Sequence, residues 1–263
     1  MPLAERTSSS QATAASASFA PVWKVKPNVF GGPTAQEVEA DPALKPNAAI
    51  SSQGHAFVRT RTWKLLGTTK STEAVAATFT LDSATYPDPF PKAVVLEYTV
   101  TLAGSSLTTA LKAVNPKDSD VEIRFKTFYH NYIAVSDAQK ISVTDLKSGL
   151  QYKDTLKGGE MGSWDGSELK MNARIGKIFM NVGTKDGYTI RDGENVIKVS
   201  TEGLTDCFMW NPQDNAGKTP SAWSDMEPGD GDKFAGVEPG YFHEWKRLSP
   251  GEEFVRSQTL SVA

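Results

Sequence analysis

Apolar and polar residues alternate along most of this chain with a period of two. The clearest segments are 75–81, 96–102 and VEIRFK at 121–126. This alternation is typical of half-buried β-strands. Asp192-Gly193 stands between YTIR and ENVIKVS and predicts a tight hairpin. No long helical pattern, repeat or internal linker interrupts the strands. The pattern therefore predicts an all-β fold, with one antiparallel sandwich domain over residues 21–263.

Two segments depart from the alternation. Residues 1–20, MPLAERTSSSQATAASASFA, are rich in Ser and Ala and lack an apolar stretch. We interpret them as a disordered tail rather than a secretory signal. The second segment, Pro212 to Lys233, is polar and rich in Gly, Pro and Asp. It is predicted to form a long loop, and long loops in compact domains are often functional.

Composition narrows the class of protein. The chain has 263 residues, 39% of them apolar, and a net charge of −3 without any basic run. Nucleic-acid binding is not expected, because it requires a basic stripe. Apolar runs of only a few residues predict no membrane span. The single cysteine, Cys207, indicates a reducing, cytoplasmic setting and is interpreted as a buried core residue, with a nucleophile as the alternative. Targeting to an organelle by the Ser-rich tail stays open.

Short catalytic motifs are missing from the sequence. The three histidines, His55, His130 and His243, show no metal-binding spacing. The sequence also lacks a glycine-rich phosphate loop and a GxSxG nucleophile elbow. The classes of protein that carry such motifs are therefore largely excluded.

The segment QGHAFVRTRTW at 53–63 carries a first candidate site. If the backbone is extended, His55, Arg59 and Trp63 share one face with Phe57 and Arg61. Aromatic rings suit the apolar face of a sugar, and guanidinium groups bind phosphate. The alternative is an edge strand with solvated arginines.

Two further residues carry candidate chemistry. In FKTFYHNY at 125–132, the alternation places His130 on the polar face of its strand. Glu238, in FAGVEPG, is expected at the end of a buried strand that a Pro239-Gly240 turn terminates. A partly desolvated carboxylate there has a raised pKa and can act as a base near neutral pH. A surface histidine and a solvated turn residue are the alternatives, and nothing favours a site role for His243.

Six segments together resemble the glucose-6-phosphate 1-epimerase family, the hexose-6-phosphate mutarotases related to aldose 1-epimerase. They lie in the family's order over roughly residues 28–255. The segments are FGGP (30–33), GHAFVRTRTW (54–63), FYHNY (128–132), MWNP (209–212), SDMEP (224–228) and VEPGYFHEWKRLSPGEEF (237–254).

The resemblance implies a galactose-mutarotase-like β-supersandwich that interconverts the α and β anomers of hexose 6-phosphates. It implies that Glu238 is the base and His130 the general acid, on opposite sides of the sugar. It further implies that His55 is a second active-site histidine and that Arg59 lies near the phosphate. The implied partner is the hexose 6-phosphate alone, without metal, cofactor, nucleic acid or membrane.

The chain also departs from the family. Gly176, in IGKIFMNV, stands where the family has an aspartate that contacts the substrate, and Asp206 is the candidate replacement. APVWKVKPNVFGGP at 20–33 lacks the family's phosphate-binding arginine, and several N-terminal strands are expected to be absent. An open sheet edge with exposed apolar surface should result. A non-catalytic sugar-phosphate binder and a purely structural β domain therefore stay open, as do the preferred hexose and the oligomeric state.

Overall fold

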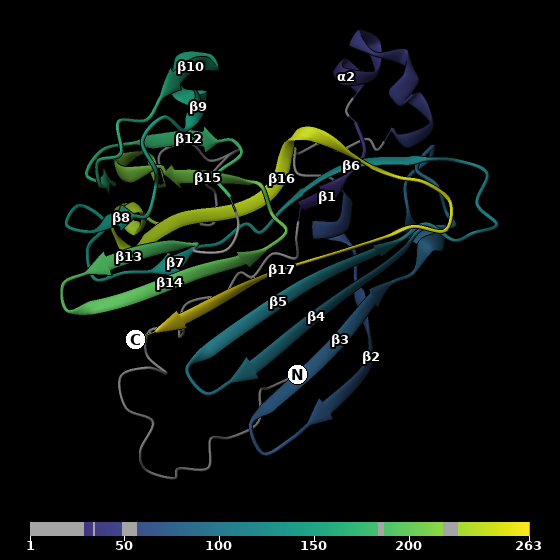
Figure 1. Cartoon of the computed structure of the whole chain (residues 1–263), viewed down its shortest axis with the longest axis horizontal. Helices are drawn as coiled ribbons and strands as arrows, with labels where there is room; N and C mark the ends of the chain where they lie inside the picture. Colours follow the sequence, from purple (N-terminus) through teal and green to yellow (C-terminus); the bar gives the residue numbers. More distant parts are fainter. Residues whose placement is uncertain (1–28, 34, 49–56, 184–186, 218–225, 263) are drawn as a thin grey trace.

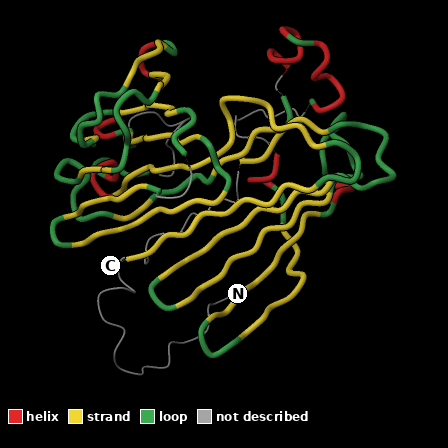
Figure 2. The backbone as a smooth tube through the Cα atoms, viewed as in Figure 1, coloured by secondary structure: helices red, strands yellow, loops and turns green. Residues whose placement is uncertain are grey.

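A computed structural model describes residues 29–33, 35–48, 57–183, 187–217 and 226–262. Within these residues the chain forms two antiparallel β-sheets with a few short helical segments (Figures 1 and 2). The all-β prediction is therefore confirmed. The predicted tail, residues 1–20, lies outside the described residues.

The eight-stranded sheet has the order β1-β6-β16-β15-β12-β9-β10, and β7 pairs with β16 beside β6. Its central strand, β16, lies between β15 and β6 (Figure 1). The strands of this sheet are β1 (Val29–Gly31), β6 (Ile123–Phe128), β7 (Ile133–Ala134), β9 (Gln151–Asp154), β10 (Glu160–Ser163), β12 (Ile175–Phe179), β15 (Asp206–Asn211) and β16 (Phe234–Leu248).

The nine-stranded sheet has the order β11-β8-β13-β14-β17-β5-β4-β3-β2. The predicted hairpin is confirmed, because Asp192 at the end of β13 pairs with Asn195 of β14 and the turn between them begins at Gly193, whose φ is 61°. The strands are β2 (Trp63–Lys70), β3 (Ala74–Leu81), β4 (Val95–Ala103), β5 (Ser106–Val114), β8 (Ser142–Thr144), β11 (Leu169–Lys170), β13 (Tyr188–Asp192), β14 (Asn195–Glu202) and β17 (Glu253–Val262).

The helical segments are short. They are the α-helix α2 (Ala35–Ala40) and the 3-10 segments η1 (Pro42–Asn47), η2 (Phe57–Thr60), η3 (Ser83–Thr85), η4 (Thr155–Lys157), η5 (Gln213–Asn215) and η6 (Asp230–Lys233). The predicted loop from Pro212 to Lys233 thus contains two 3-10 segments, and its residues 218–225 are outside the described part. In the residues that the structure covers, no helix has both the length and the hydropathy needed to cross a bilayer.

Two apolar clusters fill the interior. One contains Phe125 and Phe254, whose rings meet edge to face with centroids 5.1 Å apart. The other contains Val237 of β16 and Leu260 of β17. Inward residues of β6 are buried and alternate with half-exposed ones, as its period-two pattern predicts. The opposite, outward face of the eight-stranded sheet is therefore free to carry polar chemistry.

Strand β16 corrects one expectation. Pro239 and Gly240 do not end the strand, because it continues from Phe234 to Leu248. Glu238 thus lies inside a central strand instead of at a strand end. The proline is tolerated for a local reason. Its carbonyl accepts from Tyr129 N at 2.9 Å, so its missing N–H faces the gap between β6 and β7, where the regular ladder is interrupted.

The expected open edge is found at β2. Nearly all of this strand is exposed, and no described strand pairs with its outer side. Large apolar side chains are exposed on β2 and on the neighbouring strands β3 and β4, which extend the sheet at the lower right of Figure 1. They are Leu65, Leu66, Val75, Val95 and Leu102.

Candidate active site

Glu238 and His130 form the centre of the candidate site. On one side of β16, Glu238 is opposite Phe208 of β15. On the other side of β16, Gly240 is opposite Phe128 of β6. His130, two residues after Phe128, reaches Glu238 from that side. His130 Nδ1 is 3.2 Å from Glu238 Oε1. The two groups that the sequence placed on opposite sides of a sugar are therefore in direct contact.

Burial controls the chemistry of Glu238. The side chain is 0% exposed, and desolvation raises the pKa of its carboxyl well above the usual value. In the described part of the chain neither carboxylate oxygen accepts a regular hydrogen bond, and the imidazole of His130 is the ionisable group beside it. A carboxyl in this setting holds its proton to higher pH than a solvated one, which suits proton exchange near neutrality.

Aromatic rings surround the pair. The His130 ring stacks on Tyr132, with centroids 4.9 Å apart and an interplanar angle of 11°, and meets Trp210 edge-on at 6.0 Å. Phe128 lies 5.8 Å from the same imidazole. Phe128, Tyr132 and Trp210 are half-buried. Such rings lower the local dielectric and offer apolar faces to a sugar.

Two glycines allow neighbouring groups to pack closely around Glu238. Gly236 and Gly240 precede and follow it on the same face of β16. A Cβ at Gly236 would lie 2.4 Å from Trp210 O, and one at Gly240 would lie 2.4 Å from Phe128 Cβ. Only glycine fits at either position, so the neighbouring strands and rings can close around the carboxylate.

The QGHAFVRTRTW segment is only partly described. His55 lies outside the described residues. Phe57 to Thr60 form the 3-10 segment η2, so the extended face predicted for Arg59 and its neighbours is wrong. Phe57 and Val58 are adjacent and both buried, which a period-two strand does not allow. Trp63 Nε1 donates to Val58 O at 3.2 Å and closes the turn.

Arg59 belongs to a segment that packs near the edge of the eight-stranded sheet. Segment η2 contacts β1, and β1 pairs with β6 so that Val29 is opposite Phe128. The side chain of Arg59 is partly exposed. Its predicted contact with a phosphate group stays a prediction.

Asp206 forms a second carboxylate–imidazole pair. It lies on the same face of β15 as the residues around Glu238, opposite Gly240. Its Oδ1 is 2.6 Å from His243 Nδ1, and its Oδ2 accepts from the backbone N–H groups of Phe242 and His243 at 2.7 and 3.0 Å. The carboxylate is buried and its oxygens are occupied. No pattern in the sequence indicated this partner, because the pairing depends on the register shift of β16 after Tyr241.

Gly176 lies on the same face, opposite Trp210. A Cβ at this position would lie 2.3 Å from Thr155 Oγ1. That hydroxyl donates to Gly176 O at 2.9 Å. Thr155 therefore occupies the space in which a side chain at position 176 would begin. An aspartate at this position, as in the family, would not fit unless Thr155 moved.

Gly176→Asp is expected to lower the free energy of unfolding by about 1–3 kcal/mol, because the new side chain must displace Thr155 and break its hydrogen bond. Thr155→Gly in the same chain should recover most of that loss. Urea unfolding of the two single variants and the double variant measures the coupling. If the losses of unfolding free energy in the two single variants simply added in the double variant, Thr155 would not compete with the new side chain for this space.

Cys207 is a core residue. It is 0% exposed, and burial raises the pKa of its thiol well above the usual value. It packs in the same apolar cluster as Val237. The thiol is thus not activated as a nucleophile, in agreement with the interpretation of the DCFMW segment.

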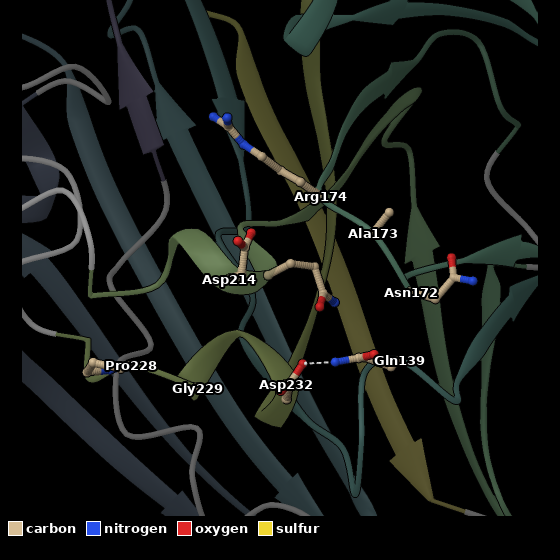
Figure 3. Close-up of a pocket in the computed structure, with 9 residues that line it drawn as sticks. Gln139, Asn172, Ala173, Arg174, Asp214, Pro228, Gly229 and Asp232 are labelled. Carbon is tan, nitrogen blue, oxygen red and sulfur yellow. Dashed lines mark hydrogen bonds between the residues drawn. The ribbon is translucent and has the colours of Figure 1, made fainter.

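A separate pocket of about 560 Å³ opens where β12 begins and β15 ends (Figure 3). Gln139 and Asp232 face each other on one side, with Gln139 Nε2 donating to Asp232 Oδ1 at 3.0 Å, and Arg174 lies on the other side. Glu238 and His130 do not line it. The described residues contain no group of three or more His, Cys, Asp or Glu side chains placed to hold a metal ion.

The chain is similar in sequence to known proteins. The sequence model of the family described as aldose 1-epimerase matches residues 36–261. A protein of Cenchrus ciliaris named "Putative glucose-6-phosphate 1-epimerase" is 27% identical over 157 residues, which are 60% of this chain and 46% of that protein. The match therefore spans less than half the length of this curated relative.

Solved structures share the fold. A "putative mutarotase" from Salmonella typhimurium superposes with a TM-score of 0.68 and 19% identity, over 82% of this chain and 70% of that one. The galactose 1-epimerase of Lactobacillus acidophilus NCFM superposes with a TM-score of 0.60 and 14% identity, over 82% and 72% of the two chains. The galactose-mutarotase-like supersandwich that the sequence predicted is confirmed.

Proposed function

Because the chain belongs to the aldose 1-epimerase family, we propose that it interconverts the α and β anomers of hexose 6-phosphates. Glu238 is the base and His130 the acid. The observation that carries the proposal is the contact of a fully buried carboxyl, whose pKa is raised, with an imidazole 3.2 Å away. The partial exposure of the rings around this pair supports a sugar as the substrate.

Contact between acid and base fits the reaction. Mutarotation removes the proton of the anomeric hydroxyl and adds a proton to the ring oxygen. Both oxygens are bonded to the same carbon, so neighbouring acid and base groups can reach both. The pair shares one proton. When this proton passes from Glu238 to His130, the imidazole can give it to the ring oxygen while the Glu238 carboxylate takes the anomeric proton. Ring closure on the other face reverses both transfers and restores the pair.

The geometry also suggests which nitrogen acts. His130 Nδ1 faces Glu238, which leaves Nε2 as the nitrogen for the ring oxygen. His55 and Asp206 remain proposed substrate contacts. Arg59 is the proposed phosphate ligand, because a guanidinium group can form two parallel hydrogen bonds with a phosphate. The printed name of the Cenchrus relative supports the 6-phosphate.

Comparing the turnover of glucose 6-phosphate with that of free glucose tests whether the substrate is phosphorylated. We expect a higher kcat/KM for the phosphorylated sugar, measured by magnetisation transfer between the anomeric NMR signals. Arg59→Ala should raise KM for glucose 6-phosphate by about 10–100-fold, the loss of a charge-assisted contact, and should change turnover of glucose little. Equal losses for both sugars would remove Arg59 from the phosphate site.

A non-catalytic sugar-phosphate binder is the second candidate. Thr155 fills the position beside Gly176 from which the family's aspartate would extend, and a small loss of substrate positioning can lower turnover by ~100-fold. Titration calorimetry with glucose 6-phosphate separates the two functions. Binding without anomer exchange would identify a binder, and neither binding nor exchange would leave a structural domain.

A further inference from the structure

Two amide side chains join the sheets directly beneath the acid–base pair. Asn131 Nδ2 donates to Gln258 Oε1 at 2.7 Å, and Gln258 Nε2 donates back to Asn131 Oδ1 at 2.9 Å. Asn131 lies between β6 and β7 in the chain, whereas Gln258 belongs to β17 of the other sheet. Gln258 is 3% exposed. The pair is therefore a polar connection inside the sandwich.

The second hydrogen of Asn131 Nδ2 reaches the backbone of the site. It is donated to Val237 O at 2.8 Å, the carbonyl directly before Glu238. The ladder between β16 and its neighbour is interrupted here, since it runs to Phe128 in β6 and resumes at Ile133 in β7. Asn131 N bonds locally to Tyr129 O at 3.0 Å instead. The Asn131 side chain thus supplies the donor that a regular strand would have offered.

The amide pair also lies between the two apolar clusters. Tyr129 belongs to one cluster and Ile133 to the other, and Phe254 and Leu260 are divided in the same way on β17. Apolar side chains could fill this place without any loss of packing. A satisfied polar pair instead fixes one register between the sheets, which packing alone specifies less strictly.

We propose that Asn131, held by Gln258, positions His130 and Glu238 relative to each other. Asn131 directly follows His130 in the chain, and its side chain is bonded to the residue before Glu238. One side chain therefore fixes the backbone on both sides of the 3.2 Å contact. The inference rests on the proposed function in the experiments that measure turnover, and the NMR experiment below does not depend on it.

Asn131→Leu is the first test. It should lower kcat by about 10–100-fold with KM nearly unchanged, because the reacting groups are displaced while the sugar surface remains. Asn115→Leu is the matched control. Asn115 is fully buried and, like Asn131, donates to a β16 carbonyl, but its acceptor is Leu248 O, at 2.9 Å, at the far end of the strand. Its replacement should lower stability and leave kcat within about twofold.

Two double variants separate positioning from folding. Asn131→Leu with Gln258→Leu removes both amides, so it should be more stable than Asn131→Leu alone, which leaves the Gln258 amide unpaired. Val237 O lacks its donor in both variants, so kcat should not recover. Asn131→Gln with Gln258→Asn restores an amide pair of the same total length and should recover part of kcat. Recovery of kcat in the apolar double variant would overturn the proposal, since the amides would then serve only folding.

A spectroscopic readout does not depend on turnover. The chain has three histidines, so the imidazole ¹⁵N signals of His130 can be assigned. Asn131→Leu should shift them and leave those of His243 in place, whereas Asn115→Leu should shift neither. Unchanged His130 signals in a folded Asn131→Leu protein would overturn the proposal. If the wild type exchanges no anomers, the proposed function fails, and these shifts still decide whether Asn131 positions His130.

Discussion

Glu238→Gln is expected to abolish anomer exchange and to leave the fold intact. The amide has the size of the carboxyl but cannot take the anomeric proton. Removal of a general base lowers turnover by about 10²–10⁴-fold. Magnetisation transfer between the α and β anomers of glucose 6-phosphate measures the rate. Glu122→Gln is the control, because Glu122 forms a half-exposed ion pair with Arg124 and should change kcat by no more than about twofold.

The same variant should be more stable than the wild type at neutral pH. The pKa of Glu238 is raised by burial in the folded state, so the folded protein holds a proton that the unfolded chain releases near pH 4.5. Its stabilising contribution is complete below that pH and is lost as pH rises through the folded pKa. Glutamine mimics the protonated form at every pH. The stability difference between variant and wild type, measured by urea unfolding, should therefore grow from pH 4.5 upward.

Two results would contradict this account. A stability difference that does not change with pH would show that the Glu238 carboxyl is not desolvated in the folded protein. Unchanged turnover in Glu238→Gln would remove it from the reaction, whatever its burial. Because one measurement concerns folding and the other chemistry, each can fail without the other.

Much of the fold could be predicted from local pattern. The alternation in β6 gave the inward face of Phe125 and the outward face of His130, and Asp192-Gly193 gave a hairpin. These features depend on residues that are near each other in the chain. Period-two burial and turn chemistry are local properties, so a single sequence contains them.

Features that depend on distant partners could not be predicted in this way. Pro239 was expected to end β16, but the gap in the neighbouring ladder lets the strand continue. The pairing of His243 with Asp206 depends on a register shift, and the bond from Asn131 to Gln258 joins two sheets. The strand pattern singled out candidate residues such as Glu238, and the resemblance supplied their roles. Their contacts required the tertiary structure.

The second large loss of turnover is expected for His130→Asn. Loss of the general acid should lower kcat by about 10²–10⁴-fold, since asparagine cannot supply a proton to the ring oxygen. It also leaves the buried carboxyl of Glu238 without its imidazole neighbour. Single-turnover rates with the α anomer of glucose 6-phosphate measure the loss, and binding of the sugar phosphate should persist.

His243→Asn is the informative comparison, because it makes the same substitution in the other carboxylate–imidazole pair. Asp206 keeps its backbone donors from Phe242 and residue 243, so the expected result is a loss of about 1–3 kcal/mol in the free energy of unfolding with only a small change in kcat. The two pairs differ in their carboxylates, since Asp206 is saturated by N–H donors and Glu238 is not. If His243→Asn instead lost as much turnover as His130→Asn, the acid would have been assigned to the wrong histidine.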